Sequence, residues 1–234
     1  DVPESLYRAR LTQSEKETLL ELVLARIEQR VPVAYLTNSA WFCGLEFYVD
    51  ERTIIPRSPI SALIQDGFSS LLTHQPQRIL DLCTGSGCIA IACADKFPDA
   101  EVDAVDLSVD ALNVAEINIA RHQMEHQVFP IQSDLFNNLL GQQYDLIVSN
   151  PPYVTKEEMN SLQPEVSFEP ETALFGGEDG LMFYRAICKN YKGSLISGGT
   201  LVFEIGAAQA EDVKKIMENG GFCGVTVKKD LSGN

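Results

Sequence analysis

Residues Asn150, Pro151, Pro152 and Tyr153 combine side chains that could hold and activate a nitrogen nucleophile. Proline lacks an N–H and keeps the residue before it extended, so this loop is expected to be stiff, with carbonyl groups outside regular structure. The Asn150 side chain and the Pro151 carbonyl can then accept hydrogen bonds from one planar –NH2 group, while Tyr153 lies against its conjugated face. This arrangement suits methyl transfer to an amide or aryl amine by positioning and electrostatics. A proline turn that only ends a strand is the alternative.

A glycine turn precedes this loop in the chain. The segment "ILDLCTGSGCIAIA" places Thr84, Gly85, Ser86 and Gly87 between an expected strand and an expected helix. Glycine lets the backbone turn sharply and approach a ligand, and the helix amides then face that ligand. A dinucleotide usually requires a third, offset glycine, which is missing here. The shorter turn suits S-adenosylmethionine, which has no phosphate, although other nucleotides and an unliganded turn stay open as alternatives.

Two acidic residues follow at the ends of the next expected strands. Asp106 comes 19 residues after Gly87, where an acid in such a sheet hydrogen-bonds ribose hydroxyls. Asp134 ends the third strand and can accept from the adenine amine, with Leu135 and Phe136 flanking the base. A helix N-cap is the alternative role for Asp134.

Regular alternation of strands and helices from Arg78 onward must position these residues. Strands of this kind alternating with helices indicate an α/β fold with a doubly wound, mostly parallel sheet. The expected strands are 78–83, 101–107, 127–134, 144–150, 199–206 and 222–230, and the expected helices are 87–97, 109–122, 179–195 and 208–219.

The N-terminal quarter has a different pattern. Apolar residues at helical spacing predict a helix over 12–30, capped by Thr12 or Ser14. Aromatic and β-branched residues over 41–55 predict a β-hairpin, and a proline-led helix is expected over 58–72. The predicted organisation is a helical substrate-recognition unit (1–37), a β-hairpin linker (38–57) and a Rossmann-like catalytic domain (58–234).

Composition narrows the function classes. The net charge of −15 argues against a protein that binds nucleic-acid backbone and suits a basic partner. No apolar run approaches the roughly 18 residues of a membrane span, and the N-terminal residues lack the layout of a secretory signal, so we expect a cytoplasmic protein. Of the six cysteines, Cys83, Cys88 and Cys93 are five residues apart, which is not C-x-x-C spacing; we interpret them as small buried apolar residues and expect no metal.

The segments "DLCTGSGCIAIA", "AVDLSVDALNVAEINI", "SDLF" and "DLIVSNPPYV" resemble the HemK/PrmB/PrmC family. That resemblance covers nearly the whole chain, including "RVPVAYLTNSAWFCGLEFYVDERTIIPRSP" with Pro56 and Arg57. It implies a class I methyltransferase that moves a methyl group from S-adenosyl-L-methionine to a protein glutamine amide nitrogen, releasing S-adenosyl-L-homocysteine. Residues 31 to about 150 look most like PrmB, the ribosomal-protein branch. Residues after 150 look more like PrmC, the release-factor branch, so both substrates stay open.

By position, the resemblance also implies site residues. The substrate glutamine would contact Asn150, Pro151, Pro152 and Tyr153, with Arg57 ordering the neighbourhood and Glu169-Pro170 shaping the pocket wall. Cys83 stands where the family usually has glycine, which matters little if only its backbone is used. The implied cofactor contacts are Cys83, Thr84, Gly85, Ser86, Gly87, Asp106, Asp134, Leu135 and Asn150.

Two other functions compete with this interpretation. A nucleic-acid adenine methyltransferase could use the same Asn-Pro-Pro-Tyr loop, but it must extrude its base and needs a basic face, whereas Lys and Arg number 18 against 33 Asp and Glu. A binding module that keeps the fold without transfer is the second alternative. We therefore expect a protein substrate, no direct DNA binding and no membrane contact.

Overall fold

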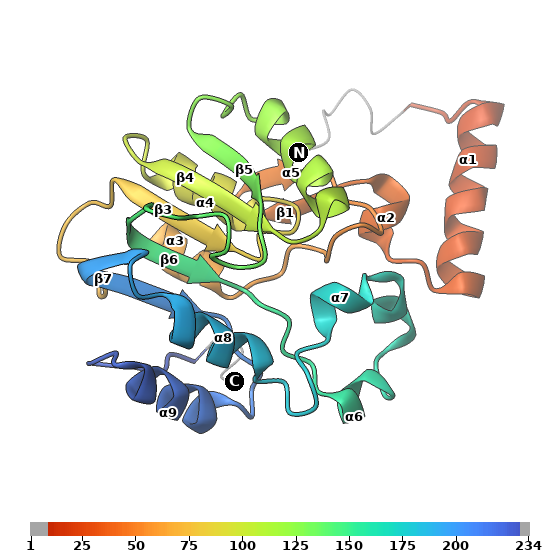
Figure 1. Cartoon of the computed structure of the whole chain (residues 1–234). Coiled ribbons are helices and arrows are strands. Elements are labelled where there is room, and N and C mark those ends of the chain that lie inside the picture. Colours follow the sequence, from red (N-terminus) through yellow and green to blue (C-terminus); the bar gives the residue numbers. More distant parts are fainter. Residues whose placement is uncertain (1–8, 230–234) are drawn as a thin grey trace.

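A five-stranded parallel sheet lies at the centre of the computed structural model, which describes residues 9–229 (Figure 1). The strand order is β5-β4-β3-β6-β7, and every neighbouring pair is parallel. The strands are β3 (Arg78–Leu82), β4 (Glu101–Asp106), β5 (Val128–Gln132), β6 (Tyr144–Ser149) and β7 (Leu195–Phe203). The prediction of an α/β doubly wound parallel sheet is therefore confirmed.

The order of the strands reverses between β3 and β6. The chain moves outward from β3 through β4 to β5, and then returns to the other side of β3 for β6 and β7. Ligands of open α/β sheets bind outside the carboxyl ends of the strands at such a reversal. A ligand site is therefore expected at the loops that follow β3 and β6.

Helices cover both faces of the sheet (Figure 1). One apolar core joins the sheet to α3 (Ile60–Gln65), α4 (Cys88–Lys96) and α5 (Val109–Arg121), and a second joins the opposite face to α8 (Met182–Asn190) and α9 (Ala210–Gly220). Side chains of β3 alternate between the two, with Ile79 in the first and Leu80 and Leu82 in the second. Because both faces are buried, apolar residues occupy most of the interior strand positions.

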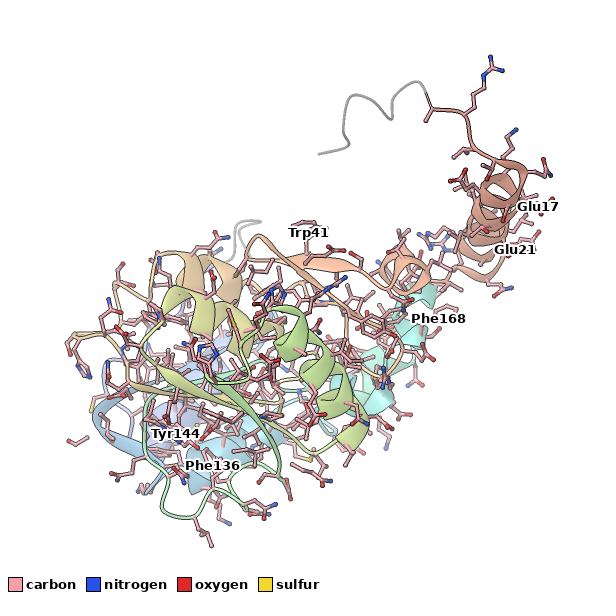
Figure 2. All side chains as sticks on the ribbon, turned by 90° about the horizontal axis from the view of Figure 1, so that it is seen from above. Glu17, Glu21, Trp41, Phe136, Tyr144 and Phe168 are labelled. Carbon is pink, nitrogen blue, oxygen red and sulfur yellow. The ribbon has the colours of Figure 1, made fainter. Side chains whose placement is uncertain are left out.

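The N-terminal helix stands away from the sheet. α1 (Gln13–Leu24) begins with a capping box between Thr12 and Glu15, and a π-helical turn (Ala25–Gln29) continues it. Together they account for the helix predicted over 12–30. None of its residues is buried, and Glu17 and Glu21 lie far from the sheet in Figure 2. Arg26 and Arg30 both pair with Glu165, which connects this helix to the segment after β6. Residues 1–8 of the predicted helical unit lie outside the described part.

The predicted hairpin is present between α2 (Val33–Thr37) and α3. Strands β1 (Ala40–Phe42) and β2 (Leu45–Phe47) pair antiparallel across a two-residue turn, Cys43-Gly44. Both turn residues have positive φ, at 52° and 85°, as a tight hairpin turn requires. Between β6 and α8 the chain forms only short elements: α6 (Lys156–Met159), a 3₁₀ turn (Pro164–Phe168) and α7 (Glu171–Leu174).

Several predicted boundaries were wrong. The helix expected over 58–72 ends at Gln65 because Gly67 and Phe68 adopt left-handed conformations, and the helix expected over 179–195 is limited to α8. Strand β7 starts four residues before the predicted 199. The strand expected over 222–230 does not form within 222–229, where Gly224 has a φ of 67°. Within residues 9–229 the structure contains no helix long and apolar enough to span a bilayer.

Candidate active site

The turn after β3 has the backbone that a close ligand contact needs. Gly85 and Gly87 have φ values of 56° and 79°, and α4 starts directly after Gly87. A Cβ added to Gly85 would meet no atom within 4 Å, whereas one on Gly87 would press on Ala115. Gly87 therefore serves helix packing, and Gly85 borders open space that a cofactor can occupy. Cys83 also has a positive φ, 63°, which explains why glycine suits its position.

Asp106 is joined to this turn. Its Oδ2 accepts the Gly85 N–H at 2.9 Å, and its Oδ1 accepts the Ser108 N–H at 2.9 Å. Burial raises the pKa of Asp106 above its ordinary value, while these backbone bonds oppose the shift. Each oxygen retains a second lone pair at the carboxyl end of β4, so the carboxylate can still receive ribose hydroxyls. The residues present fit the ribose-binding role that was predicted.

The segment after β5 forms the next part of this edge. Asp134 is exposed, and turns rather than a helix follow it, so Asp134 does not act as an N-cap. Leu135 has a φ of 48°, an unusual conformation for a leucine that is typical of functional sites. Phe136 packs into the core below α8 and α9 and is 8% exposed, so the expectation that it flanks a base was wrong.

The Asn-Pro-Pro-Tyr loop follows β6, beside the glycine turn. Asn150 is half-buried, and neither its side chain nor the Pro151 carbonyl makes a hydrogen bond within residues 9–229. Pro151 and Pro152 are buried, which fixes the backbone between them. Both acceptors are thus without a partner in the described part of the chain, at the reversal of the sheet.

Close backbone packing holds this loop in place. A Cβ on Gly176 would lie 2.7 Å from both the Pro152 carbonyl oxygen and the Tyr153 Cα, so only glycine fits there. The Gln209 Nε2 donates to the carbonyl oxygens of Tyr153, at 3.0 Å, and Gly180, at 3.3 Å. The loop therefore rests against the segment before α8 and the start of α9.

Side chains from three other segments surround Tyr153. Its hydroxyl donates to Oε1 of Glu204, at 3.1 Å, directly after β7. Arg57 binds both oxygens of the buried Glu169, at 2.6 and 2.8 Å, and so joins the hairpin linker to the segment after the loop. Burial raises the pKa of Tyr153 and of Glu204, so the hydroxyl stays protonated and can donate.

Sequence analysis missed several residues of this site. Asp81 is fully buried under the glycine turn and accepts from the Thr84 hydroxyl and the Ala90 N–H, while its Oδ1 has no partner within the described residues. Asn118 of α5 binds the backbone of both Tyr48 and Ser86. The sequence does contain a sign of both residues. Asp81 is an acid inside a strand and Asn118 is an amide on the buried face of a helix, and each interrupts an apolar pattern.

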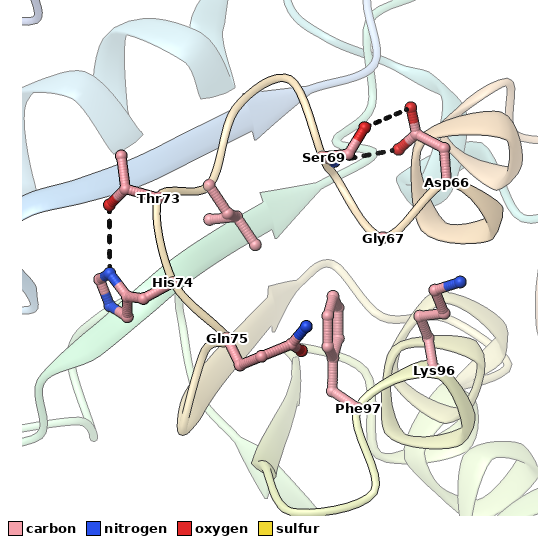
Figure 3. Close-up of a pocket in the computed structure, with 9 residues that line it drawn as sticks. Asp66, Gly67, Ser69, Thr73, His74, Gln75, Lys96 and Phe97 are labelled. Atoms are coloured by element: carbon pink, nitrogen blue, oxygen red, sulfur yellow. Dashed lines mark hydrogen bonds between the residues drawn. The ribbon is translucent and has the colours of Figure 1, made fainter.

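The predicted residues therefore meet at one edge of the sheet, at the ends of β3, β4, β5 and β6. A hollow of about 430 Å³ lies elsewhere, between the end of α3 and the end of α4, where Asp66, Ser69, His74 and Lys96 border it (Figure 3). These residues lie between α3 and β3 or at the end of α4, before β4, so the hollow lies at the amino ends of the strands. It shares no residue with the candidate active site.

The fold and the site define a class I methyltransferase. The family model of the methyltransferase small domain matches residues 63–166. A methyltransferase from Pyrococcus furiosus superposes with a TM-score of 0.60 at 17% identity, covering 94% of this chain and 93% of that one. The hMettl16 catalytic domain in complex with the MAT2A 3'UTR hairpin 6 gives 0.61 at 14% identity, covering 94% and 78%. At these identities, the two structures establish the fold alone.

Curated relatives define the family. A ribosomal protein uL3 glutamine methyltransferase of Francisella tularensis subsp. tularensis is 44% identical over 211 residues, covering 89% of this chain and 67% of the relative. One from Xanthomonas campestris pv. campestris is 46% identical over 219 residues, covering 93% and 71%. The chain belongs to the family of ribosomal protein uL3 glutamine methyltransferases. Both matches are too long to end at residue 150, so they extend into the part that looked like the release-factor branch.

Proposed function

We propose that this chain transfers a methyl group from S-adenosylmethionine to the side-chain amide nitrogen of a glutamine in ribosomal protein uL3. The observation that carries the proposal is the pair of uncommitted acceptors, the Asn150 side chain and the Pro151 carbonyl, directly after β6, whose end is paired with the end of β3 ahead of the glycine turn. An acceptor pair is what a primary amide with two N–H groups requires. The family membership supports the same chemistry.

Positioning is the main task of this site. Bound S-adenosylmethionine supplies a methyl group on a positively charged sulfur. The turn 83–87 and Asp106 would hold its amino-acid and ribose parts, and Asp134 with Leu135 would hold the adenine. Asn150 and Pro151 would hold both hydrogens of the glutamine amide and aim its nitrogen, while Tyr153 packs on the amide face. Fixing two reactants in this way removes much of the entropic barrier.

The substrate side of the proposal has an electrostatic argument. A protein that binds RNA phosphates is rich in Lys and Arg. A chain of net charge −15 attracts such a partner and repels free nucleic acid. A ribosomal protein is therefore a better match than DNA, and the named activity of the relatives supports uL3 as that protein.

Methyl transfer to purified candidates tests the proposal. The chain is incubated with S-adenosylmethionine and, in separate reactions, with uL3, a peptide-chain release factor and a DNA duplex, and each is analysed by mass spectrometry. We expect one added methyl group on a single glutamine of uL3. We expect Asn150→Ala to lower kcat by about 10²–10³-fold with the cofactor affinity mostly retained. Methylation of the release factor or DNA in preference to uL3 would contradict the proposal.

A further inference from the structure

Glu204 has a buried carboxylate that the fold does not fully use. The residue directly follows β7, is 8% exposed, and donates its N–H to the Ser149 carbonyl at 3.0 Å. Its Oε1 accepts the Tyr153 hydroxyl, but its Oε2 is buried without a hydrogen-bond partner in the described part of the chain. A carboxylate in such a place costs free energy unless it is paired.

Ion pairing does not explain this acid. Arg57 is the cation near Glu204, yet its guanidinium binds both oxygens of Glu169. The Tyr153 hydroxyl binds the carboxylate, and the Ser58 hydroxyl lies near it. The fold would lose little charge compensation without Glu204, so its role lies in the site.

The register of the sheet places Glu204 beside the acceptor pair. Ser149 of β6 is paired with Phe203 of β7, so Asn150 and Glu204 are the next residues on two adjacent strands. The chain then returns from Asn150 through the two prolines to Tyr153, whose hydroxyl reaches Glu204. The loop is thereby closed at both ends, by the strand pairing and by this hydrogen bond.

We propose that Glu204 is a positioning residue for methyl transfer: it holds the Tyr153 hydroxyl, and thereby keeps the ring against the amide that Asn150 and Pro151 bind. This inference rests on the proposed function. A ring free to rotate would not restrain the amide, so losing the acceptor weakens substrate placement and leaves cofactor binding unchanged.

The same strand provides a matched control. The Tyr144 hydroxyl, at the amino end of β6, donates to the buried Asp103 at 2.6 Å. Unlike Glu204, Asp103 also has an ion pair, with Arg78 at 2.8 Å. This second tyrosine–carboxylate pair lies in the same sheet and is separated from the site by the length of β6. Its loss should lower stability without affecting substrate placement.

The test is a double-mutant cycle on methylation of uL3 at saturating S-adenosylmethionine. We expect Glu204→Ala and Tyr153→Phe each to lower kcat/KM for uL3 by about 10-fold or more, and the double variant to be no worse than the single variants. Glu204→Gln retains a carbonyl acceptor and should recover most of the activity. The KM for S-adenosylmethionine should not change. Asp103→Asn and Tyr144→Phe should lower the Tm with kcat/KM within about 2-fold of the wild type.

Three results would overturn the proposal. The first is a folded Glu204→Ala variant as active as the wild type, with Tyr153→Phe, which removes the donor of the same hydrogen bond, serving the comparison if the alanine variant does not fold. The second is multiplicative losses in the double variant, which would mean that the two residues act independently. The third is an equal loss of kcat/KM in the control pair, which would indicate general destabilisation. If the wild type itself fails to methylate uL3, the proposed function fails, which is a distinguishable result.

Discussion

Replacing Asn118 should weaken both the fold and the cofactor site. Its side chain is completely buried on α5 and joins two segments that are far apart in the chain. Oδ1 accepts the Tyr48 N–H at 2.7 Å, and Nδ2 donates to the carbonyl oxygens of Tyr48, at 3.0 Å, and Ser86, at 2.9 Å. One amide thus connects the end of the hairpin to the glycine turn.

The expected magnitude follows from these three bonds. Asn118→Ala would leave three backbone groups without partners in the interior. Each such loss costs about 1 kcal/mol, so the free energy of unfolding should fall by about 3 kcal/mol. Because the Ser86 carbonyl belongs to the turn 83–87, the affinity for S-adenosylmethionine should also fall, by a factor of about 10 if half of that loss is local.

Urea denaturation and calorimetric titration with S-adenosylmethionine measure the two effects. Asn113→Ala is the control, because Asn113 is exposed on the same helix, and its replacement should change stability by no more than about 0.5 kcal/mol. An Asn118→Ala variant that loses less than about 1 kcal/mol, or that matches the control, would refute the reasoning.

Three further predictions concern other parts of the site. Gly85→Ala should raise the Kd for S-adenosylmethionine by about 10-fold, because the added Cβ enters the open space. Gly44→Ala is the control: it introduces the same left-handed strain in the hairpin and should lower stability alone. Equal Kd values for the two variants by titration would contradict this prediction. Arg57→Lys retains the charge but loses the bidentate hydrogen bond to Glu169. The KM for uL3 should therefore rise several-fold, and the affinity for the cofactor should not change. Steady-state kinetics that show the reverse would contradict this prediction. Burial raises the pKa of Asp81 from 3.8 to about 7, so its contribution to stability is fully present below pH 3.8 and is lost as the pH rises to about 7. Unfolding free energies across that range should therefore fall for the wild type relative to Asp81→Asn, and parallel curves would refute the assignment.

The sheet and its edge were predictable because their signals are local. Each strand from β3 to β6 is a short apolar run between turn residues, and Gly87 and Ser108 mark the starts of α4 and α5. In a parallel sheet, the ends of such runs must share one edge. The convergence of the turn 83–87, Asp106 and the Asn150 loop therefore required no knowledge of distant contacts.

The remaining features depend on contacts that local patterns do not contain. Asn118 binds a residue 70 positions away, and Tyr153 binds one 51 positions away. The segment 222–229 has the residue types of a strand, but a strand forms only where a partner backbone is available, and no pairing with β7 occurs there. Phe136 follows a predicted site residue in the chain, yet its side chain packs in the apolar core between the sheet and α8 and α9.

The two tyrosine–carboxylate bonds have a consequence for β6 as a whole. A hydrogen bond fixes Tyr144 at the amino end of β6, and another fixes Tyr153 beyond its carboxyl end. Sliding β6 by one residue would turn every side chain to the other face and would break both bonds together. The position of Asn150 along the strand axis is therefore fixed at both ends of β6.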